Sequence, residues 1–219
     1  MPTLYNRIQG QNVERLAALS DGIFAVAMTL LVLDLHVPVR DAIHSEHELH
    51  LALLALAPQF LTYLMSFLTL GIFWAGQQTQ LNHLERADRD LTWLDLAFLA
   101  AISMMPFTTR LLAEFITYRT SLVLYWLNIL VAGALLYISW RYAARARLIK
   151  PDTPIEIQKA VCRRVIIAQS LYAFGALLCV INAYWSIAFI VLVQLNYAIA
   201  PRILAGKSKT NSDDTAIPS

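Results

Sequence analysis

Long apolar stretches separated by short polar segments make up most of this chain. A helix needs about 20 predominantly apolar residues to cross the roughly 30 Å hydrocarbon core of a bilayer. Six stretches reach or approach that length, at residues 16–37, 50–76, 92–112, 121–141, 162–183 and 185–205. The pattern therefore predicts an all-α, polytopic membrane protein with six transmembrane helices per subunit.

Pro58 and Pro106 lie inside these stretches and modify the predicted helices. Proline is tolerated in the first turn of a helix, whereas in the interior it bends the helix. We expect the second stretch, which contains Pro58, to kink or to begin with an interfacial turn, and we expect a bend near the end of the third span at Pro106. Residues 1–205 are predicted to form one six-helix transmembrane domain, followed by a disordered cytoplasmic tail at 206–219.

The composition supports a membrane protein. Hydrophobic residues make up 58% of the chain and charged residues only 15%, whereas soluble domains carry about 25% charged residues. The net charge of +2 is too small to indicate nucleic-acid binding. The short loops leave no room for a soluble catalytic domain, and no span carries a serine–histidine–aspartate set or a zinc-protease motif. We therefore expect a protein that is not an enzyme and has no cofactor or metal.

Two features of well-known channels are missing from the sequence. It contains no TVGYG-like run that could form rings of backbone carbonyls, and no span carries an arginine at every third position. A conventional potassium selectivity filter and a voltage-sensor helix are therefore excluded.

The lysine and arginine positions orient the predicted spans. Six spans place both termini on the same side of the membrane. That side holds all of the 17 lysines and arginines except Arg40, Arg110 and Arg119. Because cytoplasmic loops carry an excess of lysine and arginine, we predict a multi-pass protein of the plasma membrane with both termini in the cytoplasm.

Polar residues cluster where the first apolar stretch begins. Arg15 lies five and six residues before Ser20 and Asp21, so these side chains are not direct i,i+4 partners on one helix. One interpretation is that Ser20 and Asp21 mark the helix start, where capping and acidic residues are favoured. The other is a buried polar network that fixes this helix against its neighbours. Asp95, in the third stretch, is a further carboxylate that needs a partner.

An apolar stripe follows on the same helix. Val26, Leu30 and Leu33 are spaced i, i+4 and i+7, with Thr29 beside them. Such a stripe is usually ordinary helix packing, but around a symmetry axis it can also gate a pore by dewetting. The Thr29 hydroxyl could contact a passing cation or bond to its own backbone one turn back.

All of the chain's five histidines except His83 fall between residues 36 and 50, together with several carboxylates. His44, His47 and His50 have helical i,i+3 spacing, which could suit a metal ion. The other interpretation, which we favour, is a solvated acidic rim outside the membrane that attracts cations.

The first span resembles a known family signature. The run RLAALSDG at 15–22, followed by IFAVAMTLLVL at 23–33, closely resembles the signature of the bacterial transmembrane protein 175 family. These proteins are six-span relatives of the endosomal and lysosomal potassium channel. Trp74 at the end of the second span and Pro106-Phe107 at the end of the third also fit the family pattern. The motifs cover about the first half of the chain.

The resemblance implies a tetramer in which the first helix of each subunit lines a central pore. It implies a constriction at Val26, with further apolar layers at Leu30 and Leu33 and with Thr29 facing or adjoining the ion path. The residues it implies for an inter-helix polar network are Arg15, Ser20, Asp21 and Trp74. Leu19 replaces the phenylalanine of the motif, and Gln77 and Gln78 replace a pair of histidines, which leaves the partner of the network open.

The expected function is a potassium-permeable cation channel, a homotetramer in the lipid bilayer that conducts monovalent cations. The alternative is a proton-coupled secondary transporter that uses Asp21, Asp34 or Asp95 as a relay. A non-conducting membrane scaffold is a third interpretation. An oligomer favours the pore, because a transporter can work as a monomer.

Overall fold

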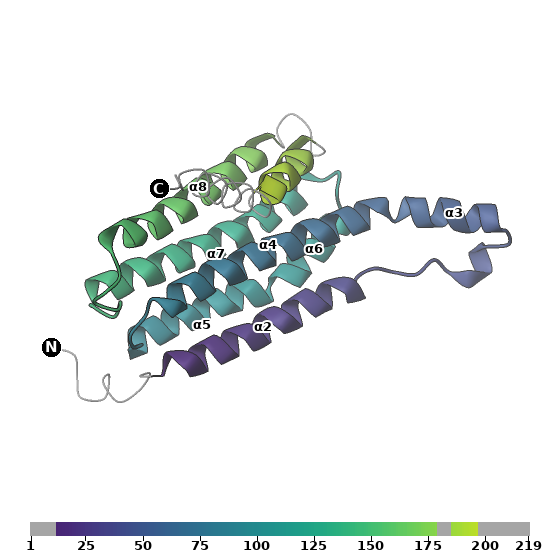
Figure 1. Ribbon diagram of the computed structural model, residues 1–219. Coiled ribbons are helices and arrows are strands. Elements are labelled where there is room, and N and C mark those ends of the chain that lie inside the picture. The colour runs from purple at the N-terminus through teal and green to yellow at the C-terminus, as the bar shows by residue number, and fades with distance from the viewer. Residues whose placement is uncertain (1–11, 179–184, 197–219) are drawn as a thin grey trace, which may run out of the picture.

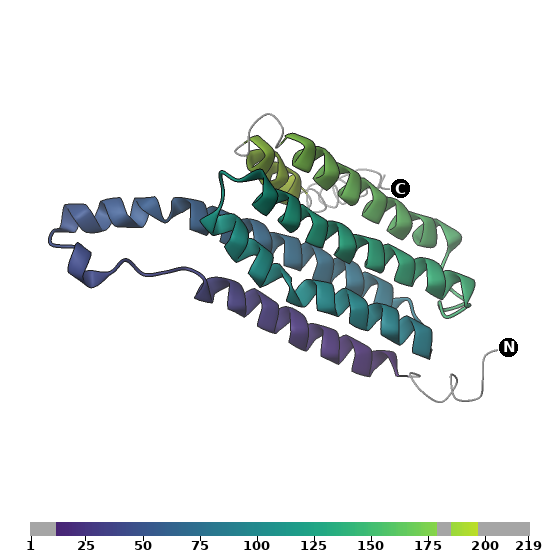
Figure 2. The same ribbon diagram turned by 180° about the vertical axis from the view of Figure 1, so that it is seen from behind.

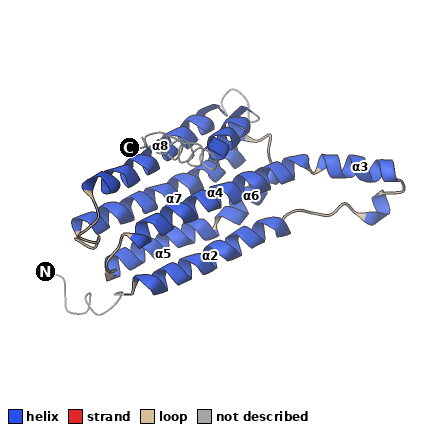
Figure 3. Cartoon of the chain, in the orientation of Figure 1, coloured by secondary structure: helices blue, strands red, loops and turns tan. Residues whose placement is uncertain are grey.

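The computed structural model describes residues 12–178 and 185–196, which are almost entirely helical (Figure 3). The helices in chain order are α2 (Val13–Leu33), α3 (Glu46–Ala55), α4 (Ala57–Asn82), α5 (Arg89–Ser103), α6 (Met105–Glu114), α7 (Arg119–Arg145) and α8 (Ile155–Leu178), with the short helix η1 (Arg40–Ala42). A further helix covers Trp185–Asn196.

The predicted helical, multi-span fold is confirmed. Five segments are long and apolar enough to cross a bilayer, namely α2, α4, the α5–α6 pair, α7 and α8. The sixth predicted span corresponds to the helix Trp185–Asn196, whose predicted continuation to residue 205 lies outside the described residues. The predicted tail at 206–219 also lies outside them.

Both prolines interrupt helices as expected. Pro58 lies in the first turn of α4, directly after α3 ends, and Pro106 lies in the first turn of α6, directly after α5 ends. The second helical segment begins earlier than the apolar pattern predicts, at Glu46 rather than at residue 50. The reason is a polar cap, because the Ser45 hydroxyl accepts the Glu48 backbone N–H at 3.2 Å.

The long helices run side by side as a bundle (Figure 1). Helix α2 packs on α4, α5 and α6, while α8 packs on α7. In both views α2 and α8 lie on opposite sides of the bundle, and α3 projects beyond one end of it (Figure 2).

Two apolar clusters fill the bundle. In the first, the ring of Phe98 lies 6.1 Å from that of Phe24 and 6.0 Å from that of Phe73, measured between centroids, which joins α2, α4 and α5. The second surrounds the buried Trp140 of α7. This second cluster lies at the end of the bundle where α4 and α7 finish. An antiparallel bridge between Leu84 and Ile149 lies at that end and joins the α4–α5 link to the α7–α8 link.

That end of the bundle is rich in basic residues, and we call it the basic end. It contains the start of α2 and the links 83–88 and 146–154. Its described lysines and arginines are Arg15, Arg86, Arg89, Arg141, Arg145, Arg147, Lys150, Lys159, Arg163 and Arg164. The opposite end has Arg40, Arg110 and Arg119.

Candidate functional site

Helix α2 begins well before the polar cluster of the first span. Its N-cap is Asn12, whose side-chain oxygen accepts the Arg15 backbone N–H at 3.2 Å. Ser20 and Asp21 therefore lie about two turns inside the helix and do not mark its start.

One face of α2 is buried against its neighbours and carries a chain of polar contacts. The Ser20 hydroxyl donates to Gln77 Oε1, and Gln77 Nε2 donates to Asp95 Oδ1 at 2.8 Å. All three side chains are buried, so these bonds link α2 through α4 to α5 inside the bundle. Asp95 Oδ2 and Gln80 Nε2 are also buried, and neither has a hydrogen-bond partner among the described residues. Asp95 and Gln80 line one small cavity at this end of the bundle.

A second contact lies at the exposed edge of the same helix. Asp21 Oδ1 accepts the Trp74 indole N–H at 2.8 Å and the Gln78 amide at 2.7 Å. Gln77 and Gln78, whose role the sequence left open, thus bond to Ser20 and Asp21 respectively. The structure brings Trp74 and Asp21 together but keeps them apart from the buried chain. Adjacent helix residues point about 100° apart, which explains the separation.

Arg15 does not share these contacts. Its side chain is exposed, and within the described residues its guanidinium forms no ion pair. Among the described residues, Arg15 contributes its backbone N–H to the Asn12 side-chain oxygen at the helix cap.

The opposite face of α2 is exposed and mainly apolar. Leu16, Phe24 and Leu31 are buried, whereas Val26, Leu30 and Leu33 are 57%, 43% and 73% exposed. The predicted stripe therefore points away from the bundle of its own chain.

Thr29 lies on the same exposed face. Its hydroxyl donates to the backbone oxygens of Ala25 at 3.0 Å and Val26 at 2.9 Å. The proton is thus used within the helix, while the oxygen can still accept or contact a cation.

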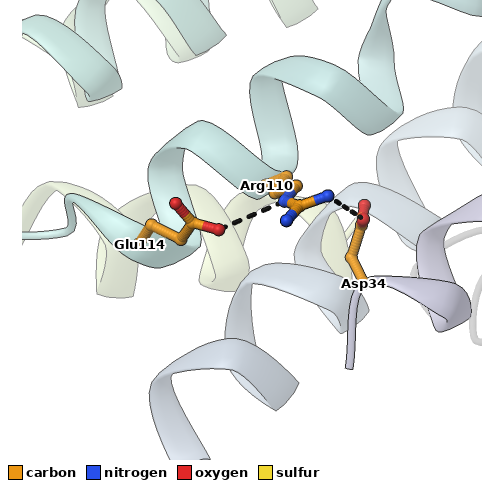
Figure 4. A network of polar contacts seen from close by, with 3 residues as sticks. All are labelled: Asp34, Arg110 and Glu114. Atoms are coloured by element: carbon orange, nitrogen blue, oxygen red, sulfur yellow. Dashed lines mark hydrogen bonds and ion pairs between the residues drawn. The ribbon is translucent and has the colours of Figure 1, made fainter. Parts of the chain in front are cut away.

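An ion pair joins the far end of α2 to α6 (Figure 4). Arg110 Nη1 lies 3.7 Å from Asp34 Oδ1, and Arg110 Nε donates to Glu114 Oε1 at 3.1 Å. The three side chains remain partly exposed, so the pair resembles a surface salt bridge. The sequence did not indicate Arg110 or Glu114 as partners of Asp34.

The three carboxylates of the possible relay do not form one path. Asp21 lies about two turns inside α2 and Asp34 lies just beyond its far end, so the two are about 20 Å apart along the helix axis. Asp95 bonds to Gln77 in the interior, and no hydrogen bond or ion pair among the described residues joins it to either of the other two.

The histidine-rich segment lies on and before the projecting helix α3. Its histidines are exposed, and His50 lies 3.8 Å from Glu46. Within the part of the chain that the structure describes, no three histidine, cysteine or acidic side chains are grouped to hold a metal ion.

The sequence pattern did not predict a buried hydroxyl cluster that the structure contains. Tyr125 OH lies 3.2 Å from both Ser66 Oγ and Thr69 Oγ1, and the Thr109 hydroxyl donates to Ser66 at 2.7 Å. Gln194 Nε2 donates to Thr69 at 2.6 Å, which joins the last described helix to α4. The feature of the sequence that could have indicated this cluster is the placement of Ser66 and Thr69 three residues apart inside an apolar span.

Comparisons with known proteins agree on one family. The family described as "Endosomal/lysosomal potassium channel TMEM175" matches residues 15–106. A protein of Streptomyces collinus named as a potassium channel is 31% identical over 189 residues, which cover 84% of this chain and 90% of the relative. Another from Chamaesiphon minutus, also named as a potassium channel, is 28% identical and covers 84% of this chain and 93% of the relative.

A solved structure agrees with these relatives. The crystal structure of a lysosomal potassium-selective channel TMEM175 homolog from Chamaesiphon minutus matches with a TM-score of 0.76 and 25% identity. The match covers 87% of this chain and 98% of that one. The human endosomal/lysosomal proton channel TMEM175 is 35% identical over 98 residues, which are 42% of this chain and 19% of the relative.

Proposed function

Because this chain belongs to the TMEM175 family, we propose that it is a potassium-permeable cation channel. The bacterial relatives that it matches over most of their length are named as potassium channels. In this proposal the protein lies in the plasma membrane as a homotetramer, with the basic end in the cytoplasm.

The observation that supports the pore most strongly is the exposed face of α2. Val26, Leu30 and Leu33 are apolar but turn away from the packed face of their own subunit. Four copies of this face around an axis would form a narrow, apolar channel. Val26 forms the constriction in this arrangement, and Leu30 and Leu33 form two further layers.

Polar groups on the same side favour a pore over simple contact with lipid. Thr29 lies in the middle of the exposed face. Asp21 lies at the edge of that face, where it is bonded to Trp74 and Gln78. Carboxylates in membrane helices usually face a protein interior or a water-filled cavity rather than lipid.

The mechanism follows from these positions. Asp34 and Glu114, at the end of the bundle away from the basic end, favour cations at the outer mouth. The cation then loses part of its hydration shell to pass the apolar layers, and the width of the throat and the cost of dehydration set the selectivity. The buried chain from Ser20 through Gln77 to Asp95 positions α2 near the cytoplasmic end.

Cysteine accessibility tests this arrangement. The parent protein carries Cys162→Ser and Cys179→Ser, and Val26→Cys is then exposed to a charged, water-soluble thiol reagent in liposomes. We expect the reagent to block potassium flux through Val26→Cys but not through Val131→Cys, a control at a 43% exposed position on α7. Equal insensitivity of both variants, or saturable flux with slow turnover, would contradict the pore.

A further inference from the structure

A groove lies between α7 and α8 at the basic end, on the opposite side of the subunit from α2. Its volume is about 550 Å³, and it lies open to the surroundings of the subunit. The residues that matter most in its lining are Tyr137, Arg141, Lys159, Arg163, Ile166 and Ile167. If α2 lines the pore, this groove faces the lipid around the channel.

Three basic side chains line the groove, and no acidic residue of the described part of the chain lines it. Arg141 comes from α7, and Lys159 and Arg163 come from α8. None of the three forms an ion pair within the described residues. Glu156 lines the neighbouring hollow beside Lys159 and Arg163, but it is not paired with either.

Arg141 is held in place without being neutralised. Its Nη1 donates to the Tyr137 hydroxyl at 3.0 Å, and its guanidinium carbon lies 5.7 Å from the centroid of the same ring. The base of the groove is fixed by the Trp140 indole N–H, which donates to the Gln158 backbone oxygen at 3.1 Å. These contacts orient a guanidinium whose fork of donors suits a phosphate group.

The position of the groove across the membrane matches that of a phospholipid. Helix α7 has 27 residues, which at about 1.5 Å each span roughly 40 Å, longer than the hydrocarbon core of about 30 Å. Its last turns, with Arg141, therefore reach the headgroup layer. Along α8, Ile166 and Ile167 lie about two turns deeper than Lys159 and are 52% and 41% exposed.

We propose that this groove binds an anionic phospholipid. Its phosphate lies between Arg141 and the cations of α8, and its acyl chains lie along Ile166 and Ile167. Basic pockets between transmembrane helices on the cytoplasmic side are suited to such headgroups. The proposal does not depend on which ion the protein conducts.

Native mass spectrometry of the delipidated, full-length protein tests the proposal. The wild type is titrated with phosphatidylglycerol and, separately, with phosphatidylcholine. We expect a clear preference for phosphatidylglycerol, and a loss of at least about tenfold in its affinity in the double variant Arg141→Gln/Arg163→Gln. The matched control Arg86→Gln/Arg147→Gln removes the same charge from the basic end outside the groove and should keep the affinity.

A charge-conserving variant and a competition experiment distinguish a lipid site from a site for soluble anions. Arg141→Lys/Arg163→Lys keeps both charges and should keep the preference for phosphatidylglycerol over phosphatidylcholine. If the glutamine variant does not fold, loss of this preference in the lysine variant would count against the proposal. Equal binding of the two lipids by the wild type, or an equal loss in the control pair, would overturn the proposal. Displacement of phosphatidylglycerol by millimolar inorganic phosphate would also overturn it and indicate a site for soluble anions.

Discussion

The buried bond between Gln77 and Asp95 should contribute measurably to stability. Gln77 Nε2 donates to Asp95 Oδ1 at 2.8 Å, and the two side chains are only 1% and 5% exposed. Hydrogen bonds inside membrane proteins contribute about 0.6 kcal/mol on average and up to about 1.7 kcal/mol. Because both groups are buried, we expect a value near the upper limit, about 1.5 kcal/mol, which is about tenfold in the unfolding equilibrium constant.

A double-mutant cycle isolates this value. The four proteins are the wild type, Gln77→Leu, Asp95→Leu and the double variant. Either single change leaves a buried polar group without its partner, whereas the double change removes both groups. We therefore expect the double variant to be about 1.5 kcal/mol more stable than the sum of the single effects predicts. The assay is reversible unfolding in mixed micelles, followed by the helical circular-dichroism signal.

The bond between Gln78 and Asp21 is the matched control. It joins the same two residue types at 2.7 Å but lies at the exposed edge of α2. Competition from water should reduce its coupling to about 0.5 kcal/mol. Additive effects of Gln77→Leu and Asp95→Leu, or an equal or larger coupling in the exposed pair, would refute the reasoning that burial sets the strength of these contacts.

Three further predictions concern other contacts. Arg110→Gln leaves Asp34 without its counter-charge and should raise potassium conductance at about 10 mM salt. At about 1 M salt the Debye length is only about 3 Å, so conductance should not change. An equal effect at both salt concentrations would contradict this prediction. In Gly133→Ala the added methyl group would clash with the side-chain amide of Gln169, so we expect a lower melting temperature. A second change, Gln169→Ala, should restore the melting temperature, and no recovery in the double variant would count against this contact. Thr29→Val should change stability by less than about 1 kcal/mol, because among the described residues its hydroxyl bonds within its own helix. The change should nevertheless alter the potassium-to-sodium permeability ratio measured from reversal potentials, and an unchanged ratio would remove Thr29 from the ion path.

The sequence predicted the spans well because apolar length and proline act locally. Pro58 and Pro106 both lie where new helices begin. The start of α3 was missed because its first turn is polar and is set by the Ser45 cap rather than by apolar periodicity. Pattern alone also suggested the stripe of Val26, Leu30 and Leu33 without deciding what it contacts.

The contacts of α2 could not be predicted to the same degree. Phe24 and Leu33 are both apolar, but one is buried and the other is exposed, and only tertiary packing distinguishes them. The sequence suggested one polar network, whereas Ser20 and Asp21 form two separate contacts. Partners on other helices, such as Arg110 for Asp34, depend on which helices are adjacent, and a single sequence does not contain that information.

Ion flux in liposomes tests the central claim, that α2 lines a potassium-permeable pore, most directly. Purified wild type, Val26→Trp and Val131→Trp are compared under a potassium gradient, with sodium as the second ion. We expect rapid potassium flux in the wild type and in Val131→Trp, and almost none in Val26→Trp, because four indoles would fill the throat. No flux from folded wild-type oligomers, or equal flux in all three proteins, would contradict the account.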